Sequence, residues 1–306
     1  MKFAPEAEQL AFARSVAELL ADADTPAVIR AWGSGDPAPG RKLWTRLAEQ
    51  GVLSLGDADS GATPADLVLA FEQLGRFAVP GPYVESVAVL PALGVEVGDS
   101  IAALAAPPHV PYALDAGVAD AVYLLAGSTL SFAEVTSAKE SVDKARLLGA
   151  VRAVGESREV DSLVAFERGV LAVSAQLLGL GAALLDRSVA YAKQRNQFGK
   201  PIGSFQAVKH QLADVSVGLE LARPLLFGAA LSLDTSMAAR DVSAAKVACT
   251  DAAYRAARTA LQVHGAIGYT AEYDLALWLT KVRALMSAWG TQRWHRDRIR
   301  AAIRGG

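Results

Sequence analysis

The sequence contains little cysteine and little histidine. Cys249 is the single cysteine among 306 residues, and there are four histidines. One cysteine excludes a disulfide within the chain. The histidines are scattered and lack the Cys/His spacing that holds zinc. We therefore expect neither a disulfide framework nor a metal centre.

The chain also lacks an excess of charge. Its 30 Lys and Arg residues against 32 Asp and Glu give a formal net charge of −2, which offers no electrostatic reason to expect a nucleic acid or an acidic membrane as partner. The first residues contain no apolar signal core. The apolar run 171–185 is interrupted by polar residues and glycines, and it is shorter than the ~20 residues of a membrane span. The sequence therefore predicts a cytoplasmic protein with no nucleic-acid or membrane partner.

The chain is rich in apolar residues, and many of them recur with the periodicity of an α-helix. With 52% hydrophobic residues, a chain of this length can bury a large core in two or three domains or layers. Apolar residues recur at three- and four-residue steps over 6–20, and 42–50 and 64–77 follow the same pattern. We expect Thr63 to cap the last of these helices, with Pro64 at its first position.

The character of the sequence changes at about residue 100. Prolines and short apolar runs up to residue 163 are typical of strands, and long helices return from 164 onward. We predict a mainly α fold with a small β insert: an N-terminal helical domain (1–99), a reduced middle β-rich domain (100–163) and a C-terminal helical bundle (164–306). Gly179 and Gly181 lack the third glycine and the preceding strand of a dinucleotide loop, so they predict close helix packing instead.

Two motifs carry a family resemblance. The first is Arg195-Asn-Gln-Phe198-Gly199-Lys-Pro-Ile-Gly-Ser-Phe-Gln206, and the second is Gln262-Val-His-Gly265-Ala-Ile-Gly-Tyr-Thr. Together they resemble the carboxy-terminal half of the flavin-dependent acyl-CoA dehydrogenases. The run that starts at Gly268 is similar to short acyl-CoA dehydrogenase-like subunits encoded beside steroid-degrading genes in actinobacteria.

This resemblance implies an architecture and a chemistry. The fold would be an N-terminal helical domain, a middle β domain and a C-terminal four-helix bundle, assembled as a homo- or hetero-oligomer, a dimer of dimers. The cofactor would be FAD, the substrate an acyl-CoA thioester, and the electron acceptor an electron-transfer flavoprotein. The reaction would remove a proton from Cα and a hydride from Cβ of the thioester. The middle segment is about half the family's usual length and shows no match to its flavin-covering motif.

The resemblance also assigns cofactor-binding residues. Arg195 would contact the flavin diphosphate of a neighbouring subunit, because a planar guanidinium suits phosphate oxygens. Phe198 would pack near the adenosine, and Gln206 would hydrogen-bond the dinucleotide. A second set lies along the adenosine diphosphate or contacts a flavin phosphate: Gln262, Gly265 and Thr291. The second glycine of the family's pair is Ala266 in this chain.

The catalytic glutamate of the family is absent. Its loop, Tyr-Glu-Gly-Thr in the commonest arrangement, reads Ala288-Trp289-Gly290-Thr291, and an indole cannot accept a proton. A second arrangement places the glutamate on a helix about eighteen residues before the aromatic of the Gly-Tyr pair, which leads to Asp251. Asp251 is either this base or an exposed helix residue paired with Arg255 four residues on.

The other polar residues are expected to have structural roles. Glu272 and Asp274 are expected to orient the glycine turn, and His264 and Cys249 are expected to be buried and inert. Three functions stay open. The chain is an autonomous flavin-dependent acyl-CoA dehydrogenase with Asp251 as base, a non-catalytic subunit that completes the FAD site of a paralogous chain, or a flavin-free interaction module.

Overall fold

The front of the chain forms four helices. The computed structural model describes residues 5–270 and 273–304. The front helices are α1 (Ala7–Ala21), α2 (Thr25–Gly33), α3 (Ala38–Glu49) and α4 (Pro64–Arg76). A capping box between Thr63 and Asp66 begins α4 with Pro64 in its first turn, which confirms the predicted start. The periodicity did not indicate α2.

Short helical segments connect these parts. The π-helix η3 (Val84–Val89) crosses the core, and five 3-10 turns lie elsewhere. The 3-10 turns are η1 (Leu53–Gly56), η2 (Ala58–Ser60), η4 (Pro91–Leu93), η5 (Ile202–Ser204) and η6 (Gly265–Tyr269).

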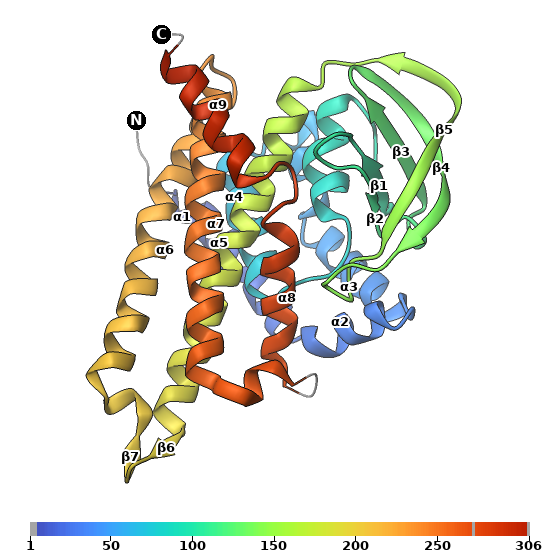
Figure 1. The fold of residues 1–306 in the computed structure, drawn as a ribbon. Coiled ribbons are helices and arrows are strands. Elements are labelled where there is room, and N and C mark those ends of the chain that lie inside the picture. The colour runs from blue at the N-terminus through green and yellow to red at the C-terminus, as the bar shows by residue number, and fades with distance from the viewer. Residues whose placement is uncertain (1–4, 271–272, 305–306) are drawn as a thin grey trace.

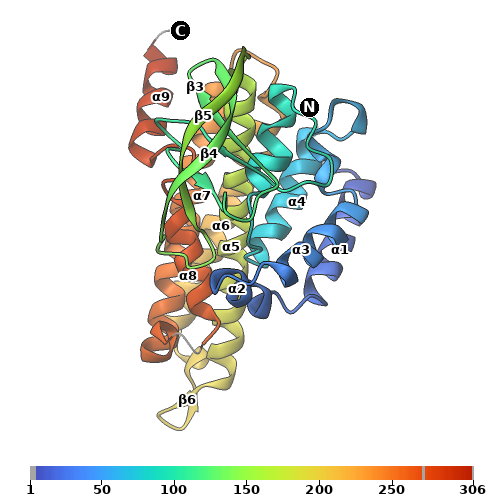
Figure 2. The same cartoon turned by 90° about the vertical axis from the view of Figure 1, so that its right-hand side faces the viewer.

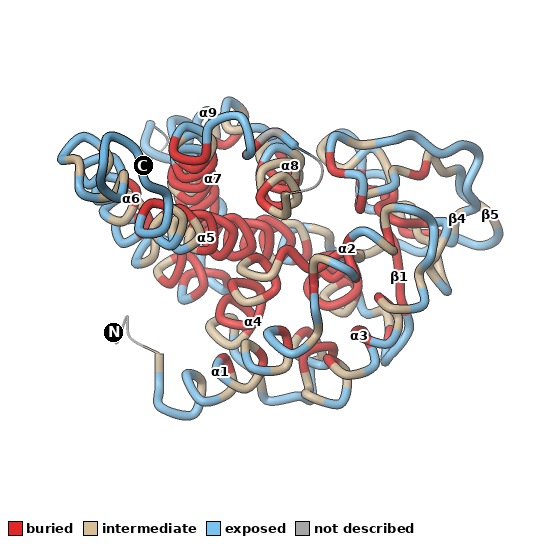
Figure 3. Tube along the Cα trace, turned by 90° about the horizontal axis from the view of Figure 1, so that it is seen from below, coloured by how far each residue is buried: buried red, intermediate tan, exposed pale blue. Residues whose placement is uncertain are grey.

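The middle of the chain forms one five-stranded sheet. Its strands are β1 (Ala102–Ala105), β2 (Ala113–Leu114), β3 (Ala121–Ala126), β4 (Thr129–Lys139) and β5 (Leu148–Glu159), in the order β1-β3-β4-β5-β2. β1 pairs parallel with β3, and the other pairs are antiparallel. The sheet lies beside the bundle, with β4 and β5 on its outer side (Figures 1 and 2). The outer parts of these two long strands are exposed to solvent (Figure 3).

The rest of the chain is a helical bundle around a central helix. It comprises α5 (Leu163–Gln194), α6 (Gln206–Ser232), α7 (Ala238–His264), α8 (Leu275–Leu285) and α9 (Gln292–Arg304), with a small hairpin, β6 (Asn196–Gln197) and β7 (Lys200–Pro201), at its lower end (Figure 1). A Cβ on Gly179 would lie 1.9 Å from the carbonyl oxygen of Glu72 in α4, so no side chain fits there. This confirms the predicted close packing of helices at Gly179.

One hydrophobic core runs through the front helices and the bundle and includes residues of the sheet. The division into three domains therefore stays a prediction. Helices α5 and α6 are long and apolar enough to cross a membrane by length and composition. The sequence predicted no membrane span, because the apolar run 171–185 is shorter than one. The apolar window of α5 is 83% buried inside the protein, and that of α6 is 44% buried. The cytoplasmic location stays a prediction.

Candidate functional site

Three predicted cofactor residues lie together at the tip of the bundle. Arg195 caps the C-terminal end of α5, Phe198 lies at the turn of the β6–β7 hairpin, and Gln206 begins α6. All three are exposed, and Phe198 is 90% exposed while its ring meets Phe205 edge-on. Phe198 and Gly199 both have positive φ, at 54° and 77°, which makes the tight turn that lifts the phenyl ring into solvent.

The second motif lies at the lower end of α7, the end of the bundle that also carries the hairpin (Figure 1). Gln262 and Gly265 are exposed. Gly265 has a φ of 63°, and nothing lies within 4 Å of the position of a Cβ. The space on the Cβ side of Gly265 is therefore open to a ligand, while its own N–H donates to the carbonyl oxygen of Leu261 at the end of α7. Ala266 is also exposed.

Thr291 lies elsewhere, in the turn between α8 and α9. Its hydroxyl accepts a hydrogen bond from the backbone N–H of Trp294 at 3.3 Å. The eleven residues of α8 span about 16 Å at 1.5 Å per residue, and they separate this turn from the bundle tip. The structure thus brings five of the six predicted cofactor residues to one end of the bundle and places the sixth above them.

Thr291 borders a large cavity between the sheet and the α8–α9 turn. The cavity has a volume of about 790 Å³. Its acidic, basic and histidine lining residues are Glu85, His109, Glu140, Arg146, Arg283 and Arg293. Three guanidinium groups against two carboxyl groups favour an anionic ligand. Sequence reasoning missed this set, because its members come from segments far apart in the chain.

Trp289 fills the position that the family resemblance assigns to the loop glutamate. The residue is 2% exposed and has a φ of 57°. Its ring packs on α5 at Gly169, where a Cβ would lie 2.7 Å from the indole. Its Nε1 lies 3.4 Å from Oε1 of Glu85. An indole therefore occupies space that a shorter side chain would leave to a ligand.

Buried polar groups hold this turn in place. A ring nitrogen of His295 lies 2.9 Å from the carbonyl oxygen of Trp289, and the other lies 3.1 Å from the hydroxyl of Ser243. Burial lowers the pKa of His295 to about 3, so the imidazole is neutral. The ammonium of Lys246 lies 2.8 Å from the carbonyl oxygen of Leu285 at the end of α8. These contacts fix the backbone from Leu285 to Trp289.

A smaller cavity also borders Trp289. It has a volume of about 240 Å³, and four rings border it. The rings are those of His109, Phe166, Trp289 and Trp294. The centroids of His109 and Trp294 are 4.1 Å apart, and those of Phe166 and Trp294 are 5.5 Å apart. This lining suits a flat or apolar group.

Asp251 lies on the exposed side of α7. Its side chain is 57% exposed, and Oδ2 lies 3.0 Å from a guanidinium nitrogen of Arg296. Oδ1 accepts a hydrogen bond from the amide of Gln292 at 2.7 Å. The ion-pair partner is therefore Arg296 of α9 rather than Arg255. The role of Asp251 as base stays a prediction.

Glu85 is a buried carboxyl group that sequence reasoning missed. It belongs to η3, is 3% exposed and lines the large cavity. Oε2 has no hydrogen-bond partner among the described residues. Burial raises the pKa of Glu85, while Arg146 and the Trp289 N–H lower it to a smaller extent. The available signal in the sequence was a lone carboxylate in the apolar run 83–90.

The remaining predicted residues have structural roles. Cys249 is fully buried, and burial raises the pKa of its thiol to about 12, which confirms an inert cysteine. His264 is buried between Tyr191 and Tyr273, with Nδ1 2.7 Å from the carbonyl oxygen of Ala260. Asp274 accepts a hydrogen bond from Arg30 at 2.6 Å. Glu272 lies outside the described residues.

Comparison with known proteins identifies the family. Residues 161–304 match the model of the acyl-CoA dehydrogenase C-terminal domain. The acyl-CoA dehydrogenase IpdE2 of Mycobacterium tuberculosis is 30% identical over 300 residues, which cover 90% of this chain and 91% of that protein. The chain belongs to the acyl-CoA dehydrogenase family.

Solved structures share the fold of this acyl-CoA dehydrogenase family member. The ChsE4–ChsE5 complex of Mycobacterium tuberculosis matches with a TM-score of 0.85 at 21% identity, over 100% of both chains. A variant of the Tcur3481–Tcur3483 steroid acyl-CoA dehydrogenase matches with a TM-score of 0.85 at 19% identity, over 98% of both chains. These matches confirm the predicted fold: a mainly helical protein with a small sheet and a C-terminal bundle. The family match at 161–304 includes both motifs and the Trp289 turn.

Proposed function

We propose that this chain is a subunit of an oligomeric, FAD-containing acyl-CoA dehydrogenase that introduces a double bond between Cα and Cβ of a CoA thioester. One observation carries the proposal. Five predicted dinucleotide-binding residues lie exposed at the tip of the bundle, whereas Thr291 and the large cavity lie above them. The family resemblance implies that a dinucleotide held at the tip of one subunit would reach the cavity of another, so that each subunit would complete its neighbour's site.

The residues at the tip fit the adenosine diphosphate half of FAD. Arg195 offers a planar guanidinium, and Gly265 leaves open space beside the backbone, where no Cβ would block the approach of a phosphate. Phe198 presents an exposed ring on which an adenine can stack. Bound FAD would supply the acceptor for the hydride that leaves Cβ. The residues of the chain would bind its phosphates, exclude water and remove the proton from Cα.

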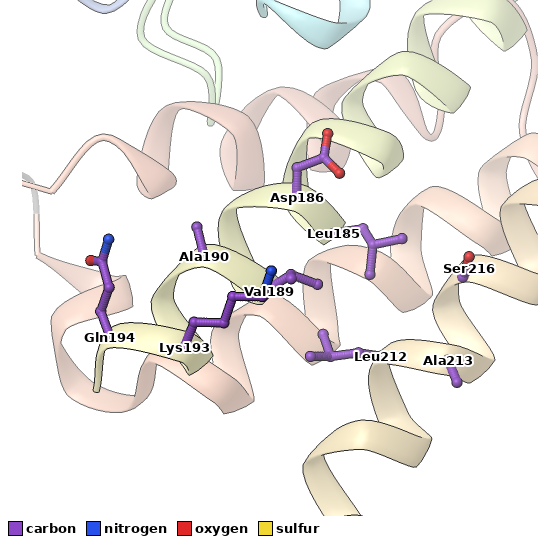
Figure 4. Close-up of a pocket in the computed structure, with 9 residues that line it drawn as sticks. All are labelled: Leu185, Asp186, Val189, Ala190, Lys193, Gln194, Leu212, Ala213 and Ser216. Atoms are coloured by element: carbon purple, nitrogen blue, oxygen red, sulfur yellow. The ribbon is translucent and has the colours of Figure 1, made fainter. Parts of the chain in front are cut away.

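Apolar surface on α6 supports an oligomer. Val217, Leu221 and Leu225 are exposed at helical spacing on this helix. Nearby, a groove of about 560 Å³ runs between α5 and α6, with Leu185, Val189 and Leu212 among its lining residues (Figure 4). We propose that a second bundle covers this surface, in the dimer of dimers that the family resemblance implies.

Trp289 supports a second candidate function. Because an indole replaces the loop glutamate, the chain would complete the FAD site of a paralogous subunit that carries the base. The fold match to the ChsE4–ChsE5 complex, an assembly of two named proteins, supports this version. The match to a steroid acyl-CoA dehydrogenase supports a steroid-derived acyl group as one substrate to test. An electron-transfer flavoprotein would reoxidise the flavin in either version.

The visible absorption spectrum of the chain, purified alone from flavin-replete cells, tests the proposal. A flavin band that a short-chain or steroid CoA thioester bleaches would support autonomous dehydrogenation. A flavin band that no thioester bleaches would favour the subunit that needs a paralogous partner. Protein without flavin, both alone and after co-expression with a paralogous chain, would contradict both versions and leave the flavin-free module.

A further inference from the structure

Glu85 occupies an unusual place for a carboxylate. It is 3% exposed, and its neighbours on η3, Val84, Val87 and Ala88, are buried and apolar. An ionised carboxyl group costs several kcal/mol to bury unless hydrogen bonds or opposite charges compensate for lost water. Oε1 faces the Trp289 N–H at 3.4 Å, a long contact, and Oε2 has no partner among the described residues. The structure therefore leaves one carboxyl oxygen of Glu85 uncompensated within the protein.

The backbone of η3 positions this side chain. The N–H of Leu90 donates to the carbonyl oxygen of Glu85 at 2.9 Å, a five-residue step instead of the four of an α-helix. Such π-type turns change the direction in which the following side chains point, and they occur frequently at functional sites. Glu85 borders the large cavity and also a small one of about 10 Å³ that it shares with Arg146. That smaller space is about the size of one water molecule.

The other carboxyl groups near these cavities are already engaged. Glu140 lies at the exposed edge of the large cavity and pairs with Lys144 at 2.7 Å. Glu167 borders the smaller, ring-lined cavity and forms a bidentate ion pair with Arg298. Asp251 has two donors and is mostly exposed. Among the described residues that line the 790 Å³ and 240 Å³ cavities, Glu85 is the carboxyl group with a buried oxygen that has no hydrogen-bond partner.

We propose that Glu85 is the base that removes the proton from Cα of the thioester, in place of the loop glutamate that Trp289 replaces. This inference rests on the proposed dehydrogenation. In the step, Oε2 takes the proton and becomes part of a neutral carboxylic acid, and the electron pair of the broken C–H bond stays on the thioester as an enolate. The Trp289 N–H faces Oε1 and favours the ionised form. Burial raises the pKa of Glu85, because it disfavours the charged form.

Proton removal can be measured without any redox step. Phenylacetyl-CoA has acidic α hydrogens and no β hydrogen to lose as hydride, so it reports deprotonation alone. In D₂O, an enolate that forms at Glu85 takes back a deuteron after the carboxyl proton exchanges with solvent. Mass spectrometry then follows deuterium entering the α position. Binding is read separately from the fluorescence of Trp289 and Trp294, which border the cavities.

The experiment uses the full-length protein, in whatever oligomer it forms. We expect wild-type protein to accelerate exchange over buffer, Glu85→Gln to lower that acceleration about a hundredfold or more, and Glu85→Asp to recover part of it. Glu18→Gln, which removes an exposed carboxylate on α1, is the matched control and should exchange like wild type. Thermal melts establish that each variant is folded.

Three results would overturn the assignment. They are wild-type exchange no faster than buffer, Glu85→Gln exchange at the wild-type rate, and loss of exchange in Asp251→Asn with retention in Glu85→Gln. The flavin spectrum of the preceding section tests dehydrogenation independently. Exchange that depends on Glu85 without flavin bleaching would keep the base and reject autonomous dehydrogenation, so the two failures are distinguishable.

Discussion

The indole of Trp289 rests directly on the backbone of Gly169. A Cβ on Gly169 would approach this ring to 2.7 Å, closer than real Cβ contacts occur. The two residues are 120 positions apart and form one packed unit between α5 and the α8–α9 turn. A larger residue in place of Gly169 would create a clash at this contact, and a smaller residue in place of Trp289 would leave a cavity. The effect of each change on stability can be measured.

Gly169→Ala should destabilise the protein. The clash with Trp289 should cost about 1–3 kcal/mol in the free energy of unfolding, set against a gain of about 1 kcal/mol from helix propensity. Gly218→Ala is the matched control, because nothing lies within 4 Å of its Cβ position on α6. Urea denaturation should show Gly169→Ala less stable than Gly218→Ala by about the clash energy. Equal stability of the two variants would mean that the indole moves aside without cost.

Arg195→Ala should lose flavin while the fold stays intact. Arg195 is exposed at the bundle tip, so its removal leaves no cavity. Loss of a charge-assisted hydrogen bond costs about 1.5–3 kcal/mol, or about 10- to 100-fold in affinity. Lys209→Ala removes another exposed cation near the start of α6 and is the control. The ratio of flavin absorbance to protein absorbance measures the effect, and an equal loss in both variants would argue against a specific role for Arg195.

Stability should fall in acid because of His295. Its folded pKa is lowered to about 3 by burial, whereas the unfolded value is about 6.5. Between these values the unfolded chain binds a proton that the folded chain does not, so stability is lost as pH falls. The slope approaches about 1.4 kcal/mol per pH unit for this one proton. Urea denaturation from pH 7 to pH 4 should show a smaller slope in His295→Gln, which cannot titrate; an unchanged slope would contradict the prediction.

Local patterns in the sequence predicted local structure well. Thr63, Pro64 and the apolar periodicity that follows define α4, since capping and amphipathicity depend on neighbours within a few residues. The family motifs led to Arg195 and Phe198 at one exposed tip. Neither signal reveals Glu85, because its π-helical turn and its unpartnered oxygen depend on η3 packing against a turn some 200 residues later. Counting residues back to Asp251 likewise located a position on a helix, but it did not show which side of the helix that residue faces.

Trp289→Glu recreates the family's loop glutamate and should be strongly destabilising in this chain. Loss of a buried indole costs about 3–5 kcal/mol through the cavity it leaves. The new carboxyl group would lie beside Glu85, whose Oε1 is 3.4 Å from the indole nitrogen in the wild type.

Two adjacent carboxyl groups cannot both ionise cheaply, so one pKa would rise and the variant would lose further stability as pH increases. Adding Glu85→Gln should restore part of this loss, chiefly above pH 6, and a double-mutant cycle of unfolding free energies isolates the coupling. Zero coupling between the two positions would show that the cavity cost alone explains the defect. It would also place the carboxyl of Glu85 too far from the α8–α9 turn to act in place of the missing glutamate.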